Sequence, residues 1–234
     1  LIQTRTALND LLNRRGRGDN VIGALLGTEG SHALDGKLEN IDRLYAAGFR
    51  MMGLQHFFDN RLGGSLHGES QTGLTDFGEE AVRTMHARGI MIDVAHSSEA
   101  TVRDTLRVTD GGALIVSHTG FNGHCPSPRN ISDETMAMIT EAGGLIGVGF
   151  WSDVTCGEGI NAIVNAIRYG IDRFGLEHIA LGSDWDGSVT TPIDASQLPH
   201  LTQALLDADF TEQEVVAVMG GNMARFLGEH LPPQ

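Results

Sequence analysis

The stretch IMIDVAHSS at residues 90–98 decides the fold class, because it joins a short apolar run to a polar end. An apolar run of this length is typical of a strand that is buried on both faces, as in a parallel sheet. His96 follows directly where the run ends. The next apolar run, ALIVS at residues 113–117, is likewise followed by a histidine, His118. The two stretches predict neighbouring parallel strands whose carboxyl ends carry polar side chains.

Four more apolar runs of this kind occur along the chain. They are VIGALL at residues 21–26, MMGL at 51–54, LIGVGF at 145–150 and HIALG at 178–182. Amphipathic segments with N-capping residues at their start or glycine at their end lie between the runs and predict helices. The clearest of these segments are residues 38–48, 75–89 and 132–143. Strands that alternate with single helices predict a parallel sheet covered by helices.

Polar side chains follow the strand ends in five places. They are Glu29, His56, His96, His118 and Asp184. In a (β/α)8 barrel all strand ends converge on one mouth, whereas an open doubly wound sheet spreads several of them away from a single crevice. This pattern favours a TIM-type barrel, with the open sheet as the alternative.

The number of strands predicts that the barrel is incomplete. Six apolar runs are present, and a (β/α)8 barrel has eight strands. We therefore expect residues 1–234 to be a single domain that covers about the third to the eighth βα unit, with the first two units missing from this chain. A barrel without two adjacent strands would expose unpaired edges, so we expect a fragment of a longer chain or a companion segment.

The composition excludes several classes of function. The chain has 16 basic and 30 acidic residues and a formal net charge of −14, which argues against a nucleic-acid partner. No apolar run approaches the roughly 18 residues that a transmembrane helix needs. The hydrophobic fraction of 41% is enough for a real core. The sequence therefore predicts an acidic protein without a nucleic-acid partner or a transmembrane segment.

Glu29, His96 and His118 are the residues whose chemistry suits a metal ion. Imidazole nitrogens and a carboxylate form the mixed ligand set that zinc accepts. A histidine that follows a strand is more often an ordinary hydrogen-bonding loop residue. Residue type and spacing alone leave the two interpretations evenly matched.

Longer motifs resemble the membrane dipeptidase (renal dipeptidase) family of zinc metallopeptidases, and its bacterial branch in particular. The motifs are GTEGSHAL at residues 27–34, LQHFFDNRLGGSLHG at 54–68, MIDVAHSS at 91–98, VSHTGFNGHCPSPRNISDE at 116–134 and ALGSDWDGSVTTP at 180–192. They occur in the family's order and span nearly the whole chain. The resemblance implies a (β/α)8 barrel with two zinc ions, and a metallodipeptidase that hydrolyses dipeptides by means of a zinc-activated bridging water.

The resemblance also assigns roles to single residues. Glu29 matches the glutamate that bridges the two zinc ions, and His96 and His118 match the histidines of the second ion. His56 matches the histidine that polarises the substrate, and Asp184 matches the acid–base aspartate. Glu29, His96 and His118 form one full set of zinc ligands, with Glu29 as the bridging carboxylate.

Arg129 matches the family's arginine that binds the free C-terminal carboxylate of the substrate. A guanidinium can bind a carboxylate through two parallel hydrogen bonds, which would explain a preference for dipeptides. In isolation, Arg129 could equally be a residue at the start of a helix that pairs with Asp133 or Glu134.

One departure from the family pattern concerns the first zinc ion. The family holds that ion with a His-x-Asp pair on the first barrel strand, and residues 1–234 contain no such sequence. The activity of this chain alone therefore stays open. Two alternatives follow: another amidohydrolase-type barrel hydrolase, whose substrate would not need Arg129, or a catalytically dead homologue that lacks the first metal site.

Cys125 and Cys156 are the only cysteines. Family members can carry a disulfide in this region, so the resemblance implies a bond between them, which a Cα separation above ~7 Å would rule out. A disulfide would favour the bacterial cell envelope or export, with a signal in the missing N-terminus, over the cytoplasm. The expected partner is a dipeptide substrate, and a homodimer is left open. Other histidines, including His67, are assigned ordinary surface or helix roles.

Overall fold

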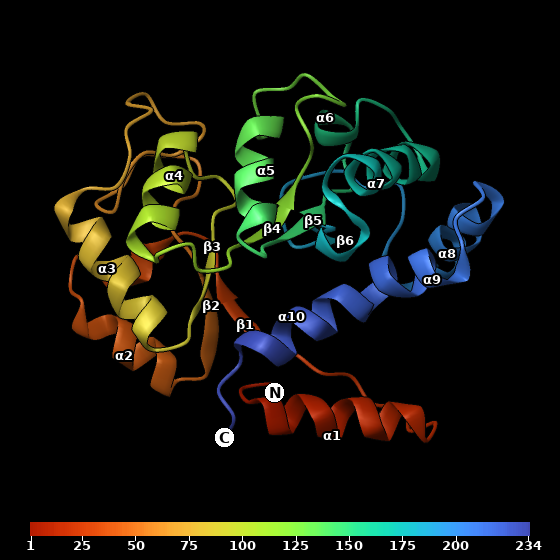
Figure 1. Cartoon of the computed structure of the whole chain (residues 1–234), viewed down its shortest axis with the longest axis horizontal. Helices are drawn as coiled ribbons and strands as arrows, with labels where there is room; N and C mark the ends of the chain where they lie inside the picture. Colours follow the sequence, from red (N-terminus) through yellow and green to blue (C-terminus); the bar gives the residue numbers. More distant parts are fainter. The chain divides into compact units, whose positions relative to one another are not determined.

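The computed structural model describes residues 1–234 and has an α/β fold with six strands in chain order (Figure 1). The strands are β1 (Leu26–Thr28), β2 (Phe49–Gly53), β3 (Met91–Asp93), β4 (Ile115–Thr119), β5 (Leu145–Val148) and β6 (Ile179–Leu181). The chain divides into two units, each of which contributes three strands. Unit 1 comprises Leu1–Gly112 and Ala224–Gln234, and unit 2 comprises Ala113–Met223. The expectation of one domain over residues 1–234 stays a prediction.

Unit 1 is built on the strands β1, β2 and β3, which pair in parallel in that order. Its helices are α1 (Arg5–Gly16), η1 (Ser31–Leu34), α2 (Glu39–Ala46), α3 (Asp76–Ala87), α4 (Glu99–Val108) and most of α10 (Asn222–His230). Helix α2 packs against β2, and α3 packs against β3 and α4. Each of these helices follows a strand and covers the sheet before the next strand begins.

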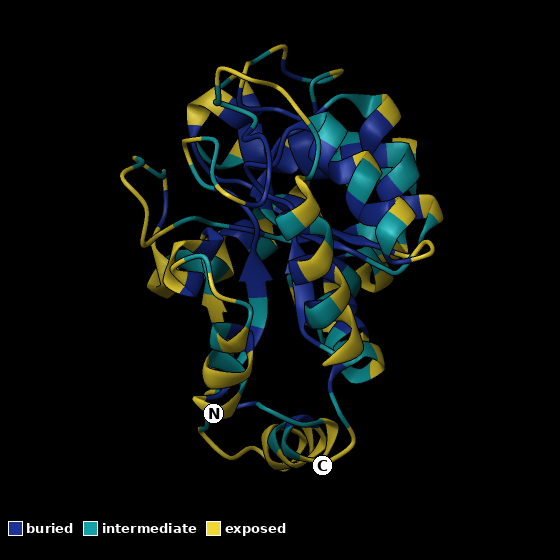
Figure 2. Cartoon of the chain, turned by 90° about the vertical axis from the view of Figure 1, so that its left-hand side faces the viewer, coloured by how far each residue is buried: buried dark blue, intermediate teal, exposed yellow.

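Unit 2 repeats this arrangement with β4, β5 and β6, where β4 pairs with β5 and β5 with β6, both in parallel. Its helices are α5 (Asp133–Glu141), α6 (Ser152–Thr155), α7 (Ile160–Phe174), η2 (Leu176–His178), η3 (Ala195–Gln197), α8 (Leu198–Asp207), α9 (Glu212–Val216) and η4 (Ala217–Gly221). The long helix α7 packs against β5 and β6 and also contacts α5 and α8. The strands of unit 2 are mostly buried, and the helices carry exposed outer faces, which are yellow in Figure 2.

The α/β class, the strands from β2 to β6 and the three predicted helices are confirmed. Helix α3 begins after Thr75, whose side chain accepts a hydrogen bond from the backbone N–H of Gly78, and α5 begins after Ser132, which accepts from Thr135. Such side-chain caps satisfy backbone donors that a helix start leaves without partners. None of the helices is long and apolar enough to cross a membrane.

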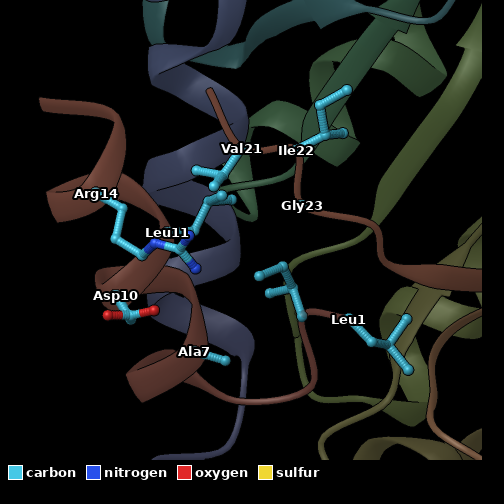
Figure 3. Close-up of a pocket in the computed structure, with 9 residues that line it drawn as sticks. Leu1, Ala7, Asp10, Leu11, Arg14, Val21, Ile22 and Gly23 are labelled. Atoms are coloured by element: carbon cyan, nitrogen blue, oxygen red, sulfur yellow. The ribbon is translucent and has the colours of Figure 1, made fainter. Parts of the chain in front are cut away.

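The prediction of a strand at residues 21–26 is wrong in its position. The strand β1 begins only at Leu26, and the apolar residues before it form the connection from helix α1, a helix that the sequence pattern did not predict. There Val21, Ile22 and Gly23 line a cavity of about 290 Å³ together with Leu11 of α1, and the side chain of Ile22 points away from that helix (Figure 3). The run is apolar because it packs beside a helix, although Ile22 itself is 91% exposed.

Candidate active site

Three side chains of unit 1 meet where β1, β2 and β3 end. The Nε2 atom of His96 lies 3.1 Å from Oε1 of Glu29, and Nε2 of His56 lies 3.6 Å from Oε2 of the same carboxylate. The candidate ligand atoms of these three residues all lie within 4.8 Å of one another. We refer to Glu29, His56 and His96 as the histidine–glutamate cluster.

A glycine lets the strand ends approach closely enough to form this cluster. A Cβ atom on Gly53, the last residue of β2, would lie 2.9 Å from both the carbonyl oxygen of Thr28 and the backbone nitrogen of Gly30. Real Cβ atoms do not come so close to backbone. Glycine at this position therefore brings the segment of His56 next to the segment of Glu29.

His96 is the most constrained residue of the cluster. Its side chain is 4% exposed, whereas those of His56 and Glu29 are 34% and 42% exposed. Its backbone has φ = +66°, a left-handed conformation that is uncommon outside glycine and costs free energy. Strain of this kind persists at functional sites when the surrounding structure holds it in place. The conformation directs a buried imidazole towards the carboxylate of Glu29.

Ser65 supports both histidines from the loop that follows β2. Its buried hydroxyl lies 2.5 Å from the carbonyl oxygen of His56 and 3.1 Å from that of His96. The hydroxyl of Ser97 also donates to Oε1 of the fully buried Gln55, at 2.7 Å. These bonds tie the two histidine-bearing segments together. The sequence did not predict a role for Ser65, Gln55 or Ser97, although all three lie in the motifs that resemble the dipeptidase family.

Aromatic contacts surround the histidines. The ring centroids of His56 and His96 are 4.8 Å apart in an edge-to-face arrangement, and Phe57 lies 4.3 Å from His56. His67 lies 5.4 Å from His96 and 5.3 Å from Phe57. His67 is therefore part of the surroundings of the cluster, and its assignment to an ordinary surface role is wrong. His67 lies in the same loop as Ser65, and this loop places its ring next to His96.

In unit 2, His118 is the penultimate residue of β4 and is 8% exposed. Its Nδ1 atom shares a hydrogen bond of 2.8 Å with the hydroxyl of Ser117. A histidine that binds a metal usually has its second ring nitrogen held by a hydrogen bond, which fixes the orientation of the ring. With Nδ1 in this bond, Nε2 is the ring nitrogen of His118 that could bind an ion.

Arg129 is 8% exposed and is held in a defined position. Its Nη2 donates to the carbonyl oxygen of His118 at 2.8 Å, and its guanidinium lies 5.5 Å from the ring centroid of Trp151. The alternative partner, Asp133, instead accepts a hydrogen bond from Tyr169 and lies 3.5 Å from Arg173. The guanidinium is thus oriented by β4 and by an aromatic ring, as a binding group requires.

Asp184 begins the turn after β6. It has φ = +59°, and its carbonyl oxygen accepts from the backbone N–H of Gly187 at 3.0 Å. A Cβ on Gly187 would lie 2.7 Å from the Asp184 carboxyl carbon, so only glycine leaves room for this carboxylate. Asp184 and His96 thus share a left-handed backbone at the end of a strand.

The two cysteines are joined. Cys125 and Cys156 form a disulfide with a Cα separation of 5.3 Å, inside the ~7 Å limit for such a bond. Cys125 lies in the loop after β4, and Cys156 directly follows α6 in the segment after β5. The disulfide links the loop that carries Arg129 to the segment that carries Trp151.

These side chains occur in a chain that matches the model of the membrane dipeptidase family, peptidase family M19, over residues 2–231. The chain belongs to this family. It is 32% identical over 218 residues to the dipeptidase aclJ of Aspergillus oryzae. The aligned residues make up 89% of this chain and 51% of that protein. The chain thus spans about half the length of this relative.

Two solved structures of the family's kind share the fold. A dipeptidase described as a metallopeptidase of family M19 has a TM-score of 0.84 and is 25% identical. The match covers 100% of this chain and 71% of the dipeptidase chain. A metallopeptidase from Rhodobacter sphaeroides, liganded with a phosphinate mimic of the dipeptide L-Ala-D-Ala, has a TM-score of 0.83 and 25% identity, covering 98% and 68%. The TIM-type α/β fold class is confirmed by these matches.

Proposed function

We propose that the protein is a zinc metallodipeptidase that hydrolyses dipeptides with a free C-terminal carboxylate. The histidine–glutamate cluster is the observation that carries the proposal, because its donor atoms lie within 4.8 Å of one another. Membership of a metallopeptidase family and the dipeptide mimic bound to the Rhodobacter sphaeroides relative support it.

The residues of the cluster fit a zinc ion. The carboxylate of Glu29 and the imidazole of His96 are oxygen and nitrogen ligands of the kind that zinc takes, and His56 lies beside them as the group that would contact the substrate. His96 is buried and oriented, and Ser65 holds the carbonyl groups of both histidines. Glu29 has two carboxylate oxygens, of which Oε1 faces His96, so its side chain could hold more than one ion. We propose two zinc ions in the complete site, with His118 as a further ligand.

Zinc, when bound, polarises a carbonyl group and lowers the pKa of water towards neutrality. The chain's own residues would do the rest. His56 donates a hydrogen bond to the oxygen of the scissile carbonyl as negative charge develops on it. Asp184 accepts a proton from the attacking water and returns it to the nitrogen of the leaving amine. Arg129 binds the carboxylate of the C-terminal residue and so orients the amide bond.

The test measures zinc per chain and hydrolysis of a dipeptide panel, each dipeptide with a free C-terminus and as its amide. We expect bound zinc, hydrolysis of the free dipeptides and at least a ~30-fold lower kcat/KM for the amides, since loss of one partner of a buried charge pair costs about 2 kcal/mol or more. Arg129→Ala should remove this difference and retain zinc. Arg173→Ala, at an exposed arginine of α7, is the matched control.

Two outcomes would reject the proposal. Hydrolysis of amides and free dipeptides at equal rates would indicate another amidohydrolase-type substrate, for which Arg129 has no carboxylate to bind. A folded protein that takes up no zinc and cleaves no dipeptide would indicate a catalytically dead homologue. Zinc content and substrate preference thus distinguish a zinc dipeptidase from another amidohydrolase-type hydrolase and from a catalytically dead homologue.

We also propose that the protein works in an oxidising compartment, such as the bacterial cell envelope. The disulfide between Cys125 and Cys156 supports this, because such bonds persist outside the reducing cytosol. Fractionation of the source cells, with a thiol-labelling assay on the native protein, would test it. Two free thiols and a cytosolic location would overturn it.

A further inference from the structure

A second cavity lies in unit 2, between the segment after β5 and the loop after β6. Its volume is about 390 Å³, which falls in the range of ~300–1,000 Å³ that is typical of small-molecule pockets. Phe150 and Glu158 line one side, and Thr190, Thr191 and Pro192 line the other. None of these residues belongs to the groups that bind the ions or the backbone of the substrate in the proposed mechanism.

The cavity has an apolar part and one negative charge. Phe150 is 2% exposed, and the ring of Trp185 packs edge-to-face against it with 5.7 Å between centroids. Glu158 is the only charged residue in the lining, it is exposed, and no arginine, lysine or histidine lies within 4.0 Å of its carboxylate. A side chain with an apolar stem and a cationic end would match both features.

The proposed mechanism places the C-terminal residue of the substrate next to this cavity. Arg129 binds its carboxylate and Asp184 protonates its nitrogen, so both backbone ends of that residue contact unit 2. Trp151, beside Arg129, directly follows Phe150, and Trp185, beside Phe150, directly follows Asp184. The side chain attached between the nitrogen and the carboxylate therefore has this cavity as its neighbour.

We propose that the cavity receives the side chain of the C-terminal residue and that Glu158 selects a cationic one. The favoured substrates are then dipeptides that end in lysine or arginine. This inference rests on the proposed function, because it takes the dipeptidase orientation of the substrate as given. It adds the substrate class, for which the family match provides no assignment.

The test compares kcat/KM for three dipeptides, Ala-Lys, Ala-norleucine and Ala-Glu. Norleucine has the lysine stem without the ammonium group. We expect the protein to favour Ala-Lys over Ala-norleucine by roughly two- to fivefold at low salt, the range for a solvent-exposed ion pair, and to lose that preference at high salt. Glu158→Gln should bring the ratio to about one with Ala-norleucine unchanged, and Glu158→Lys should favour Ala-Glu. Glu141→Gln, at an exposed glutamate that ends α5, is the control.

A second variant tests the cavity itself. Thr190→Trp fills it from the exposed rim, so KM should rise for Ala-Lys and Ala-norleucine while Ala-Gly, which needs no cavity, is cleaved as before. Dipeptide hydrolysis with the same Ala-Lys preference in the protein and in Glu158→Gln would overturn the inference and leave the proposed function standing. Absence of hydrolysis on every dipeptide would overturn both.

Discussion

The two units carry different chemistry at the ends of their strands. In unit 1 the loops after β1, β2 and β3 bring together one carboxylate and two imidazoles, and further hydrogen bonds and rings hold them. In unit 2 the loops after β4, β5 and β6 present a buried guanidinium over an indole ring, a carboxylate in a tight turn and a cavity. The same architecture thus supplies the carboxylate and one imidazole proposed to bind zinc in unit 1, and most of the substrate-type groups in unit 2, where His118 is the one proposed zinc ligand.

The difference indicates that unit 1 holds its side chains in fixed positions, whereas unit 2 presents side chains suited to binding a substrate. His96 is buried and its backbone is strained, whereas Asp184 shares the backbone strain and is only half-buried. A group that holds an ion gains from being fixed, and a group that exchanges protons with a substrate must be reachable. Variants of Glu29 in unit 1 should therefore change zinc content first, and variants of Arg129 and Asp184 in unit 2 should change substrate kinetics first.

Glu29→Gln is the variant with the largest expected effect. It removes the negative charge that both His56 and His96 face, so we expect at least a ~100-fold loss of zinc affinity and of dipeptide hydrolysis. Zinc content after equilibrium dialysis, with circular dichroism to verify folding, measures it. Glu69→Gln, at an exposed position in the loop after β2, is the control. Full zinc retention in Glu29→Gln would contradict the division between the units.

Asp184→Asn should affect the chemistry and leave folding intact. An asparagine has nearly the same shape but cannot transfer the proton, so kcat should fall by ~100-fold or more, the range for loss of a general acid–base group. The pH profile of kcat/KM should lose one limb in the variant. Asp186→Asn, in the same turn and exposed, is the comparison. An unchanged pH profile with unchanged kcat would remove Asp184 from the mechanism.

Ser65→Ala tests whether the support of the two histidines matters. The variant loses the hydroxyl that lies 2.5 Å from the His56 carbonyl and 3.1 Å from that of His96. Loss of a residue that orients metal ligands typically costs 10- to 100-fold in metal affinity, and we expect about tenfold here. Ser70→Ala removes an exposed hydroxyl from the same loop and should leave zinc affinity unchanged. Equal affinities in the two variants would contradict a supporting role for Ser65.

Glu214→Gln is expected to have the smallest effect, confined to stability. The bond from Arg168 at 2.8 Å, followed by bonds from Thr211, lowers the pKa of Glu214 to about 2 in the folded chain. A lowered pKa stabilises the fold above the ordinary pKa near 4.5, and this contribution disappears as pH falls towards 2. We expect a loss of about 1 kcal/mol at neutral pH.

Urea unfolding of wild type and Glu214→Gln across this pH range measures that contribution. The two unfolding curves should converge as pH falls from 4.5 to 2, while zinc content and kcat/KM stay equal at neutral pH. Glu212→Gln, an exposed neighbour at the start of α9, is the control. A difference that persists at pH 2 would show that the carboxylate charge is not what stabilises α9.

Much of the fold was predictable because buried parallel strands leave a strong local signal. The runs at residues 90–95 and 145–150 became β3 and β5, and Thr75 and Ser132 cap the helices that they were expected to start. The run at residues 21–26 misled because apolar residues that pack beside a helix resemble a buried strand. Local sequence cannot tell which partner an apolar run will find.

The candidate site was predictable in its residue types but not in its supporting contacts. Strand ends pointed to Glu29, His56 and His96, since polar residues after parallel strands gather at one edge. The roles of Ser65 and His67 depend on how the loop after β2 folds back over the histidines, and no periodic pattern encodes that path. Long loops carry no such signal, because their conformation follows from tertiary contacts.

The disulfide between Cys125 and Cys156 couples two kinds of recognition. Cys125 lies four residues before Arg129, and Cys156 lies two residues before Glu158. One covalent bond therefore sets the spacing between the group that would bind the substrate's carboxylate and the group that would select its side chain. A thiol reductant in the assay buffer would release the covalent link between these two groups, so substrate panels should be measured with the bond intact.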